Sequence, residues 1–126
     1  MTDQGSARVL CDVDALVADG SVPGGAAWRL AEPARQLDAN LVRIPPGGHI
    51  PAHVEPHLDV LVLVVAGDGT LDSDSAGSAP QPLTPGSLVW LPHGSTRGLT
   101  AGESGMSYLT VHRRRPGMQI QARPGA

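Results

Sequence analysis

Glycine and proline interrupt this chain so often that few segments are long enough for a helix of several turns. The 126 residues include 16 Gly and 12 Pro, spread along the whole length. Because both residues interrupt regular helical hydrogen bonding, long helices are disfavoured. Short apolar runs lie between the interruptions, as expected for strands joined by tight turns. This pattern predicts an all-β jelly-roll barrel of two antiparallel sheets, with about ten short strands.

Turn residues set the bounds of the predicted strands. Two glycine-containing segments, Gly67–Gly69 and Gly102–Gly105, predict a hairpin and a turn between strands. Val9–Ala18 fits either a short strand or one to two helical turns, because its apolar spacing does not decide between them. The predicted strands are Ala26–Leu30, Asn40–Ile44, Ile50–Glu55, Asp59–Val65, Thr70–Asp72, Gln81–Thr84, Ser87–Leu91, Thr96–Thr100 and Met106–Arg113, with a candidate edge strand at Met118–Ile120.

The longest apolar run of the chain is Val60–Ala66. Its Val and Leu content fits a strand buried on both faces, inside the barrel and against a second sheet. Aromatic residues are scarce, with two Trp, one Tyr and no Phe, so we expect a core of Val, Leu, Ile and Ala. Trp28 and Trp90 are expected in that core or at a subunit interface.

Charge and cysteine content argue against several kinds of partner and compartment. The net charge of −3 predicts no attraction to nucleic acid or to an anionic membrane surface. No apolar run approaches the roughly 20 residues of a membrane span. The single cysteine, Cys11, cannot form an internal disulfide, and the N-terminus lacks the pattern of a signal peptide. We therefore expect a cytoplasmic protein.

A cluster of histidine and acidic residues precedes the longest apolar run. His53 and Glu55 are two residues apart, so on an extended backbone they point to the same face. Pro56 predicts a turn, after which Asp59 would open the next, antiparallel strand. Imidazole and carboxylate groups that converge in this way can hold a divalent metal. The alternative is a polar loop before a buried strand. The cluster comprises His49, His53, Glu55, His57 and Asp59.

The same segment resembles the first signature of the cupin superfamily. That signature is a Gly, five residues, His-x-His, three or four residues, a Glu, six residues and a Gly. Gly47 is followed by five residues and then His53, and Gly67 fits the closing position. Glu55 stands where the second His belongs. Asp59 is matched to the Glu, although the closing Gly then arrives one residue late.

Residues 86–101 resemble the second cupin signature, a Gly, five residues, Pro-x-Gly, two residues, a His, three residues and an Asn. Gly86, Pro92 and Gly94 keep this frame, whereas Arg97 replaces the His ligand and Ala101 replaces the Asn. The resemblance covers residues 24–115. It implies a cupin-like double-stranded β-helix within a single domain of residues 1–126.

The resemblance also implies a site in the barrel mouth, toward which His53, Glu55, Asp59 and Arg97 should project. Cupins usually hold Fe, Mn, Ni or Zn there with three His and one Glu. A guanidinium has no lone pair to give to a metal. Arg97 therefore favours a metal-free pocket, in which it would pair with Glu55 or Asp59.

A competing interpretation keeps one divalent Mn, Fe, Ni or Zn ion in the pocket, with Arg97 turned away. Two imidazoles and two carboxylates are acceptable ligands for such ions. The metal ligands would then be His53, Glu55, Asp59 and either His57 or His93.

The sequence does not decide which face of the last predicted strand points into the barrel. Tyr108 and His112 share one face, and Leu109 and Val111 share the other. If Leu109 and Val111 form the core, Tyr108 and His112 point away; if the opposite face lines the cavity, Tyr108 and His112 join the site. The run Arg113–Arg115 fits a solvated terminus or pairing at a dimer edge, or it could bind an anionic partner.

Two functions of different class follow. The first is binding of a small anionic organic ligand, without catalysis. The alternative is a metal-dependent enzyme of the dioxygenase or isomerase/epimerase type, acting on a small organic acid or sugar. A homodimer is also expected, because exposed sheet edges need covering. The candidate ligand-binding residues are His53, Glu55, Asp59, Arg97, Tyr108 and His112.

Overall fold

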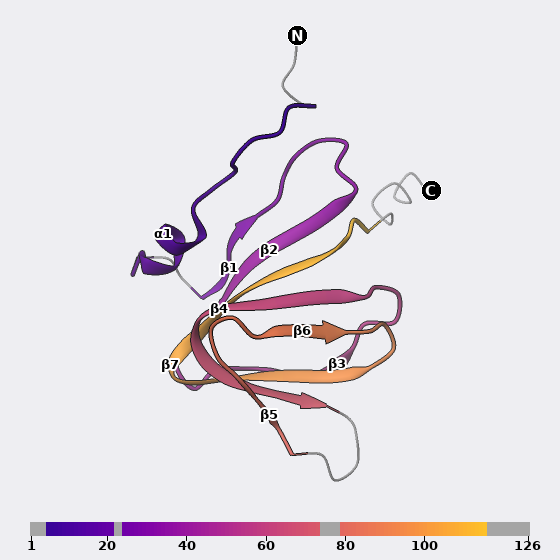
Figure 1. Ribbon diagram of the computed structural model, residues 1–126. Helices are drawn as coiled ribbons and strands as arrows, with labels where there is room; N and C mark the ends of the chain where they lie inside the picture. The colour runs from indigo at the N-terminus through magenta and orange to yellow at the C-terminus, as the bar shows by residue number, and fades with distance from the viewer. Residues whose placement is uncertain (1–4, 22–23, 74–78, 116–126) are drawn as a thin grey trace, which may run out of the picture.

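The computed structural model describes residues 5–21, 24–73 and 79–115. Within these ranges the chain forms one short helix and seven strands, and every strand pair is antiparallel (Figure 1). The elements are α1 (Val13–Ala18), β1 (Gly25–Arg29), β2 (Leu37–Ile44), β3 (His49–Val54), β4 (Val60–Ser73), β5 (Gln81–Leu83), β6 (Leu88–Leu91) and β7 (Thr96–Arg113). The prediction of an all-β fold is confirmed.

Two long strands contain the positions at which the sequence predicted reversals. Gly67–Gly69 lies inside β4 and Gly102–Gly105 lies inside β7, so the predicted hairpin and turn were wrong. The β4–β7 ladder instead shifts its register between Val64 and Ala66 and again between Gly67 and Gly69. Such bulges bend a strand without ending it. Two predicted pairs of short strands are therefore two bent strands.

The bends let β4 and β7 contribute to two layers (Figure 1). Residues 60–66 of β4 and 106–113 of β7 pair with each other and lie with β1, β2 and β6 in one layer, here called the β2 layer. Residues 69–73 of β4 and 96–101 of β7 lie with β3 and β5 in the other, the β3 layer. The two layers enclose the space in which the candidate site lies.

Glycine is required where β4 and β7 approach each other at the bend. A Cβ atom on Gly69 would collide with the backbone oxygen of Thr100, and one on Gly67 would collide with that of Gly105. Gly67 also has a φ of +71°, a conformation that side chains disfavour. The glycines at this position thus permit a sharp change of layer while the strands remain paired.

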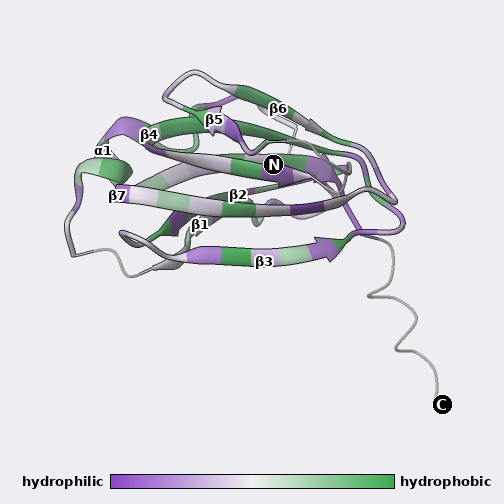
Figure 2. Ribbon diagram, turned by 90° about the horizontal axis from the view of Figure 1, so that it is seen from below, coloured by the Kyte–Doolittle hydropathy of each residue, from purple (hydrophilic) through white to green (hydrophobic). Residues whose placement is uncertain are grey.

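Apolar side chains fill the space between the layers. Val and Leu dominate this core, as the composition predicted, and Met106 and Tyr108 join them at 2% and 3% exposure. Figure 2 shows hydrophobic segments in green along β4 and β6. The core cluster is Ile44, Leu58, Val60, Val62, Val64, Leu71, Leu83, Val89, Leu91, Leu99, Ala101, Met106 and Tyr108.

Over β4 and β6, the outer face of the β2 layer is apolar and exposed. Leu61 and Leu63 of β4 point away from the core and are 43% and 37% exposed. They pair with Trp90 and Leu88 of β6, which are 58% and 68% exposed. The prediction that Val60–Ala66 is buried on both faces was therefore wrong, because nothing in the described part of the chain buries Leu61 and Leu63.

The N-terminal segment adopts the helical alternative of the two that its sequence allowed. The Asp12 side chain accepts a hydrogen bond from the backbone N–H of Ala15 and so caps α1 at its start. The candidate edge strand Met118–Ile120 lies outside the described residues. Among the residues that are described, no helix has the length and apolar character needed to cross a membrane.

Candidate ligand-binding site

A cavity of about 340 Å³ opens between the two layers. Both layers supply polar side chains to it, since Arg97 comes from the β3 layer and Tyr108 from the β2 layer. Apolar residues form the rest of its wall, among them Ile50, Val60, Val62, Leu91 and Leu99. Its ionisable lining residues are His53, Glu55, Arg97, Tyr108, His112 and Arg115.

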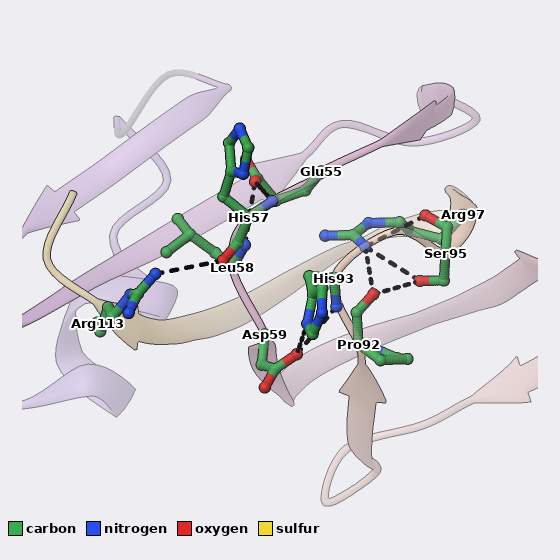
Figure 3. Close-up of polar contacts among 9 residues, drawn as sticks. All are labelled: Glu55, His57, Leu58, Asp59, Pro92, His93, Ser95, Arg97 and Arg113. Carbon is green, nitrogen blue, oxygen red and sulfur yellow. Dashed lines mark hydrogen bonds and ion pairs between the residues drawn. The ribbon is translucent and has the colours of Figure 1, made fainter. Parts of the chain in front are cut away.

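Arg97 is buried in this wall without a carboxylate partner. Its side chain lies near the start of β7, opposite His53 in the β3–β7 ladder, and the residue is only 5% exposed. Nη1 donates hydrogen bonds to the backbone oxygens of Pro92 and Ser95, at 3.2 and 3.4 Å, and to Ser95 Oγ at 3.1 Å (Figure 3). Among the described residues, no group accepts a hydrogen bond from its Nε or Nη2, and no carboxylate forms an ion pair with it.

The predicted pairing of Arg97 with Glu55 or Asp59 was wrong, and Glu55 shows one reason. Its Oε2 accepts the backbone N–H groups of His57 and Leu58 at 2.6 and 3.1 Å, while Oε1 accepts Arg115 Nη2 at 2.8 Å. The N–H of His57, followed by Arg115, lowers the pKa of Glu55 to about 2. This carboxylate is thus held in the turn between β3 and β4, although it also lines the cavity.

Asp59 supplies the other reason, because it lies outside the cavity. Its Oδ1 accepts the backbone N–H of His93 at 2.9 Å and His93 Nδ1 at 2.7 Å (Figure 3), and these contacts lower the pKa of Asp59. It lines a separate hollow with His57, Leu58, His93 and Arg113, none of which lines the cavity. The sequence therefore grouped Asp59 and His57 with His53, whereas the structure separates them.

Strand alternation explains why Asp59 faces away from the cavity. Val60, its neighbour, lines the cavity, so the preceding residue points to the opposite side. The sequence carried a signal of this register: six residues separate Val60 from Gly67, whereas counting from Asp59 the glycine arrives one residue late. Val60 therefore stands where the cupin signature has its Glu.

The residues at the four ligand positions of the cupin signatures do not fit a divalent metal. His53, Glu55, Val60 and Arg97 all line the cavity, but Val60 has no donor atom and Arg97 has no lone pair. Both carboxylate oxygens of Glu55 already accept hydrogen bonds. Within the described ranges, no group of three or more His, Cys, Asp or Glu residues is arranged to hold a metal ion.

The face of β7 that carries Tyr108 and His112 points into the cavity. The sequence alone did not decide between this face and the one that carries Leu109 and Val111. Both residues line the cavity together with Thr110. Each of the two cavity histidines bonds a backbone carbonyl through Nδ1: His53 bonds Pro51 at 3.0 Å and His112 bonds Arg113 at 2.7 Å. The Nδ1 atom of each ring is thereby engaged by the backbone.

Arg115 is a cavity residue that the sequence did not single out. It lies just beyond β7, lines the cavity and pairs with Glu55 at its rim, with a side chain that is 56% exposed. The run Arg113–Arg115 was the available signal. Alternation along β7 puts His112 in the cavity and Arg113 in the separate hollow. The strand ends at Arg113, so Arg115 reaches the cavity from the segment beyond it.

Comparisons with known proteins identify the fold of this chain. A scan against models of known families finds no match, and neither does a search of curated proteins.

Solved structures do match. KdgF from Halomonas sp. has a TM-score of 0.61 and 23% identity, covering 72% of this chain and 80% of that chain. An RmlC-like cupin protein from Desulfovibrio desulfuricans has a TM-score of 0.57 and 20% identity, covering 68% and 77%. The DMSP lyase DddQ from Ruegeria pomeroyi has a TM-score of 0.56 and 25% identity, covering 64% of this chain and 40% of DddQ. The chain has the fold of a small cupin domain, a double-stranded β-helix.

Proposed function

We propose that this protein binds a small organic anion in the cavity between its layers, through the guanidinium of Arg97. The observation that carries the proposal is a cation that is 5% exposed and has no carboxylate partner among the described residues. A buried charge is costly unless it is paired. Among the residues that the structure describes, only Nη1 of Arg97 has acceptors, so a ligand carboxylate would find Nε and Nη2 available for a bidentate pair.

The rest of the wall favours an organic anion over a hydrated inorganic one. Ile50, Val62, Leu91 and Leu99 offer apolar surface beside the cation. The cavity volume of about 340 Å³ lies at the small end of the range for ligand pockets, roughly 300–1,000 Å³. The ligand is therefore a small acid with an apolar body, and His53 and His112 would add polar contacts.

Titration of the purified protein with valerate tests this proposal by calorimetry. Arg97→Gln keeps a polar side chain but removes the charge, so we expect at least a ~30-fold loss of affinity. Arg113→Gln is the matched control, because Arg113 is also on β7 but lines the separate hollow. Its affinity should stay within about twofold of wild type. Equal affinity of Arg97→Gln and wild type for valerate would contradict the proposal.

A metal-dependent enzyme, of the dioxygenase or isomerase/epimerase type, is the second candidate. It is favoured by the presence of His53 and His112 in one cavity, and one neighbour in fold, DddQ, is named a lyase. Elemental analysis of protein purified without a metal-affinity tag tests it. One Mn, Fe, Ni or Zn ion per chain, lost in His53→Ala, would support an enzyme. Substoichiometric metal after supplementation with all four would end this alternative.

We further propose that the outer face of the β2 layer binds a second copy of this chain. Two rows of apolar side chains cross β6, β4 and β7: Trp90, Leu61 and Val111 in one, and Leu88, Leu63 and Leu109 in the other. None of the six is charged, so a two-fold related copy can lay the same rows against each other without burying a charge. Such a dimer would cover the second face of the longest apolar run.

Sedimentation velocity tests the dimer directly. Leu61→Glu places a charge in the centre of the rows and should give a monomer. Val9→Glu is the control, because Val9 is 88% exposed and belongs to neither row. It should leave the dimer intact. A monomeric wild-type protein at micromolar concentration would contradict the proposal.

A further inference from the structure

We infer that the ligand is a small oxo- or hydroxy-acid, whose second, uncharged oxygen accepts a hydrogen bond from the hydroxyl of Tyr108. This inference rests on the proposed anion site at Arg97 and adds a second recognition group to it. It turns a site for small acids in general into a site that selects among them.

Tyr108 presents a buried donor without a partner. The residue is 3% exposed and lies in the ladder between Val42 of β2 and Val64 of β4. It lines the cavity, and its hydroxyl forms no hydrogen bond with any residue that the structure describes. A buried hydroxyl is normally hydrogen-bonded, because leaving it unpaired costs free energy. A ligand oxygen in the cavity would satisfy it.

The protonation state of Tyr108 determines what kind of group it can bind. Burial raises the pKa of its phenol to about 12, so the hydroxyl keeps its hydrogen at neutral pH. It can therefore donate to a carbonyl or hydroxyl oxygen. Its partners in the neighbouring strands, Val42 and Val64, are apolar. They disfavour a second carboxylate there, which would need a cation of its own.

Other polar groups of the cavity already have protein partners. Thr110 Oγ1 accepts a hydrogen bond from Asn40 Nδ2 at 3.5 Å. The Nδ1 atoms of His53 and His112 bond backbone carbonyls. Arg97 and Tyr108 are thus the two buried lining residues, among those described, that combine near-complete burial with unused donors.

The two donors come from opposite layers of the fold. Arg97 belongs to the half of β7 in the β3 layer, and Tyr108 to the half in the β2 layer. Apolar side chains such as Leu99 and Val62 lie in the wall they share. A ligand that satisfies both therefore carries a carboxylate and a second oxygen acceptor on a short carbon skeleton.

Acids that share a carbon skeleton and differ by one oxygen test the inference. The two pairs are valerate with levulinate, and propionate with lactate. In at least one pair, wild-type protein should bind the oxygenated acid about tenfold more tightly, as expected for one satisfied buried donor. Tyr108→Phe removes only the hydroxyl. It should abolish this preference, whereas Thr110→Val should keep it.

The outcomes separate this inference from the proposed function. If acids bind and Arg97→Gln releases them, but neither pair shows a preference or Tyr108→Phe retains one, the Tyr108 inference is wrong and the anion site stands. If no acid binds, both fail.

A spectroscopic readout avoids dependence on the folding of Tyr108→Phe. Tyr108 is the one tyrosine of the chain, so a ¹³C label at the Cζ of tyrosine reports this residue alone. The tighter-binding oxygenated acid should shift its resonance, and the matched plain acid should shift it much less. Equal shifts would overturn the inference.

Discussion

Two hollows of this protein hold opposite arrangements of charge. In the separate hollow, from here on called the outer hollow, Asp59 is paired with His93, and Arg113 Nη2 donates to the backbone oxygen of His57 at 3.5 Å. In the cavity between the layers, Arg97 is almost completely buried and has no described carboxylate to pair with. The first arrangement pairs its charges within the protein, whereas the second leaves a buried cation without a described carboxylate, which is the basis of the proposed anion site.

The two hollows can be compared directly, because residues from the same short segment of sequence line both of them. Glu55 and Asp59 are four residues apart, yet one lines the cavity and the other does not. Hydrogen bonds within the turn after β3 engage Glu55, whereas Asp59 is engaged by His93 in the turn after β6, so neither acid pairs with Arg97. The cluster of ionisable residues in the sequence is therefore divided between two hollows, and the proposed anion site rests on the one buried charge without a described carboxylate partner.

The largest expected effect is on thermal stability in the presence of ligand. At a ligand concentration about 100 times Kd, binding stabilises the folded state by about 2.7 kcal/mol. For a domain of this size that raises Tm by roughly 10 °C. Wild type and Asp59→Asn should both show this rise with the tighter-binding acid, and Arg97→Gln should not, as measured by scanning calorimetry. A reduced rise in Asp59→Asn would mean that the two hollows are coupled.

A smaller effect concerns Glu55, which joins the turn to the rim of the cavity. Glu55→Gln weakens two backbone contacts and the pair with Arg115, so the free energy of unfolding should fall by about 1–3 kcal/mol in urea denaturation. Arg115→Gln is the matched variant, since it removes only the partner on the exposed side. A loss in Arg115→Gln as large as that in Glu55→Gln would assign the stability to the ion pair instead.

The same carboxylate predicts a pH dependence. The pKa of Glu55 falls from 4.5 to about 2 on folding, so the folded state favours its ionised form. Its stabilising contribution is therefore complete above pH 4.5 and is lost as the pH falls toward 2. Between these values, wild type should lose stability more steeply than Glu55→Gln. Parallel curves would contradict the assignment.

The smallest effect is expected in the outer hollow. The side chains of Asp59 and His93 are 47% and 61% exposed, and exposed ion pairs contribute little to stability. Asp59→Asn should therefore destabilise the unliganded protein less than Glu55→Gln does, in the same urea series. The reverse order would show that the outer hollow is the structurally important one.

Much of the fold was predictable because local chemistry imposes it. Most of the predicted strands correspond to observed ones, since each is an apolar run bounded by turn residues. The errors fall at Gly67–Gly69 and Gly102–Gly105, where the same residues serve a bend as well as a turn. Local sequence does not distinguish the two, because the difference lies in whether the partner strand continues to pair across the bulge.

The candidate site was predictable only in part. His53, Glu55, Arg97, Tyr108 and His112 line one cavity, as expected for ligand-binding residues, but Asp59 does not. Asp59 was misplaced because its match to the signature was one residue out of register, and one residue reverses the direction of a side chain on a strand. Arg115 was overlooked because its role depends on Glu55, sixty residues away along the chain.

By itself, the sequence determined that this chain forms antiparallel strands, with an arginine where a metal-binding cupin has a histidine. Backbone chemistry and side-chain alternation act over a few residues, so they can be read along the chain. Tertiary structure alone decided that the acids turn to other partners and that Arg97 and Tyr108 lie in opposite walls of one cavity. Those relations join residues from different layers, and they exist only after both long strands have bent.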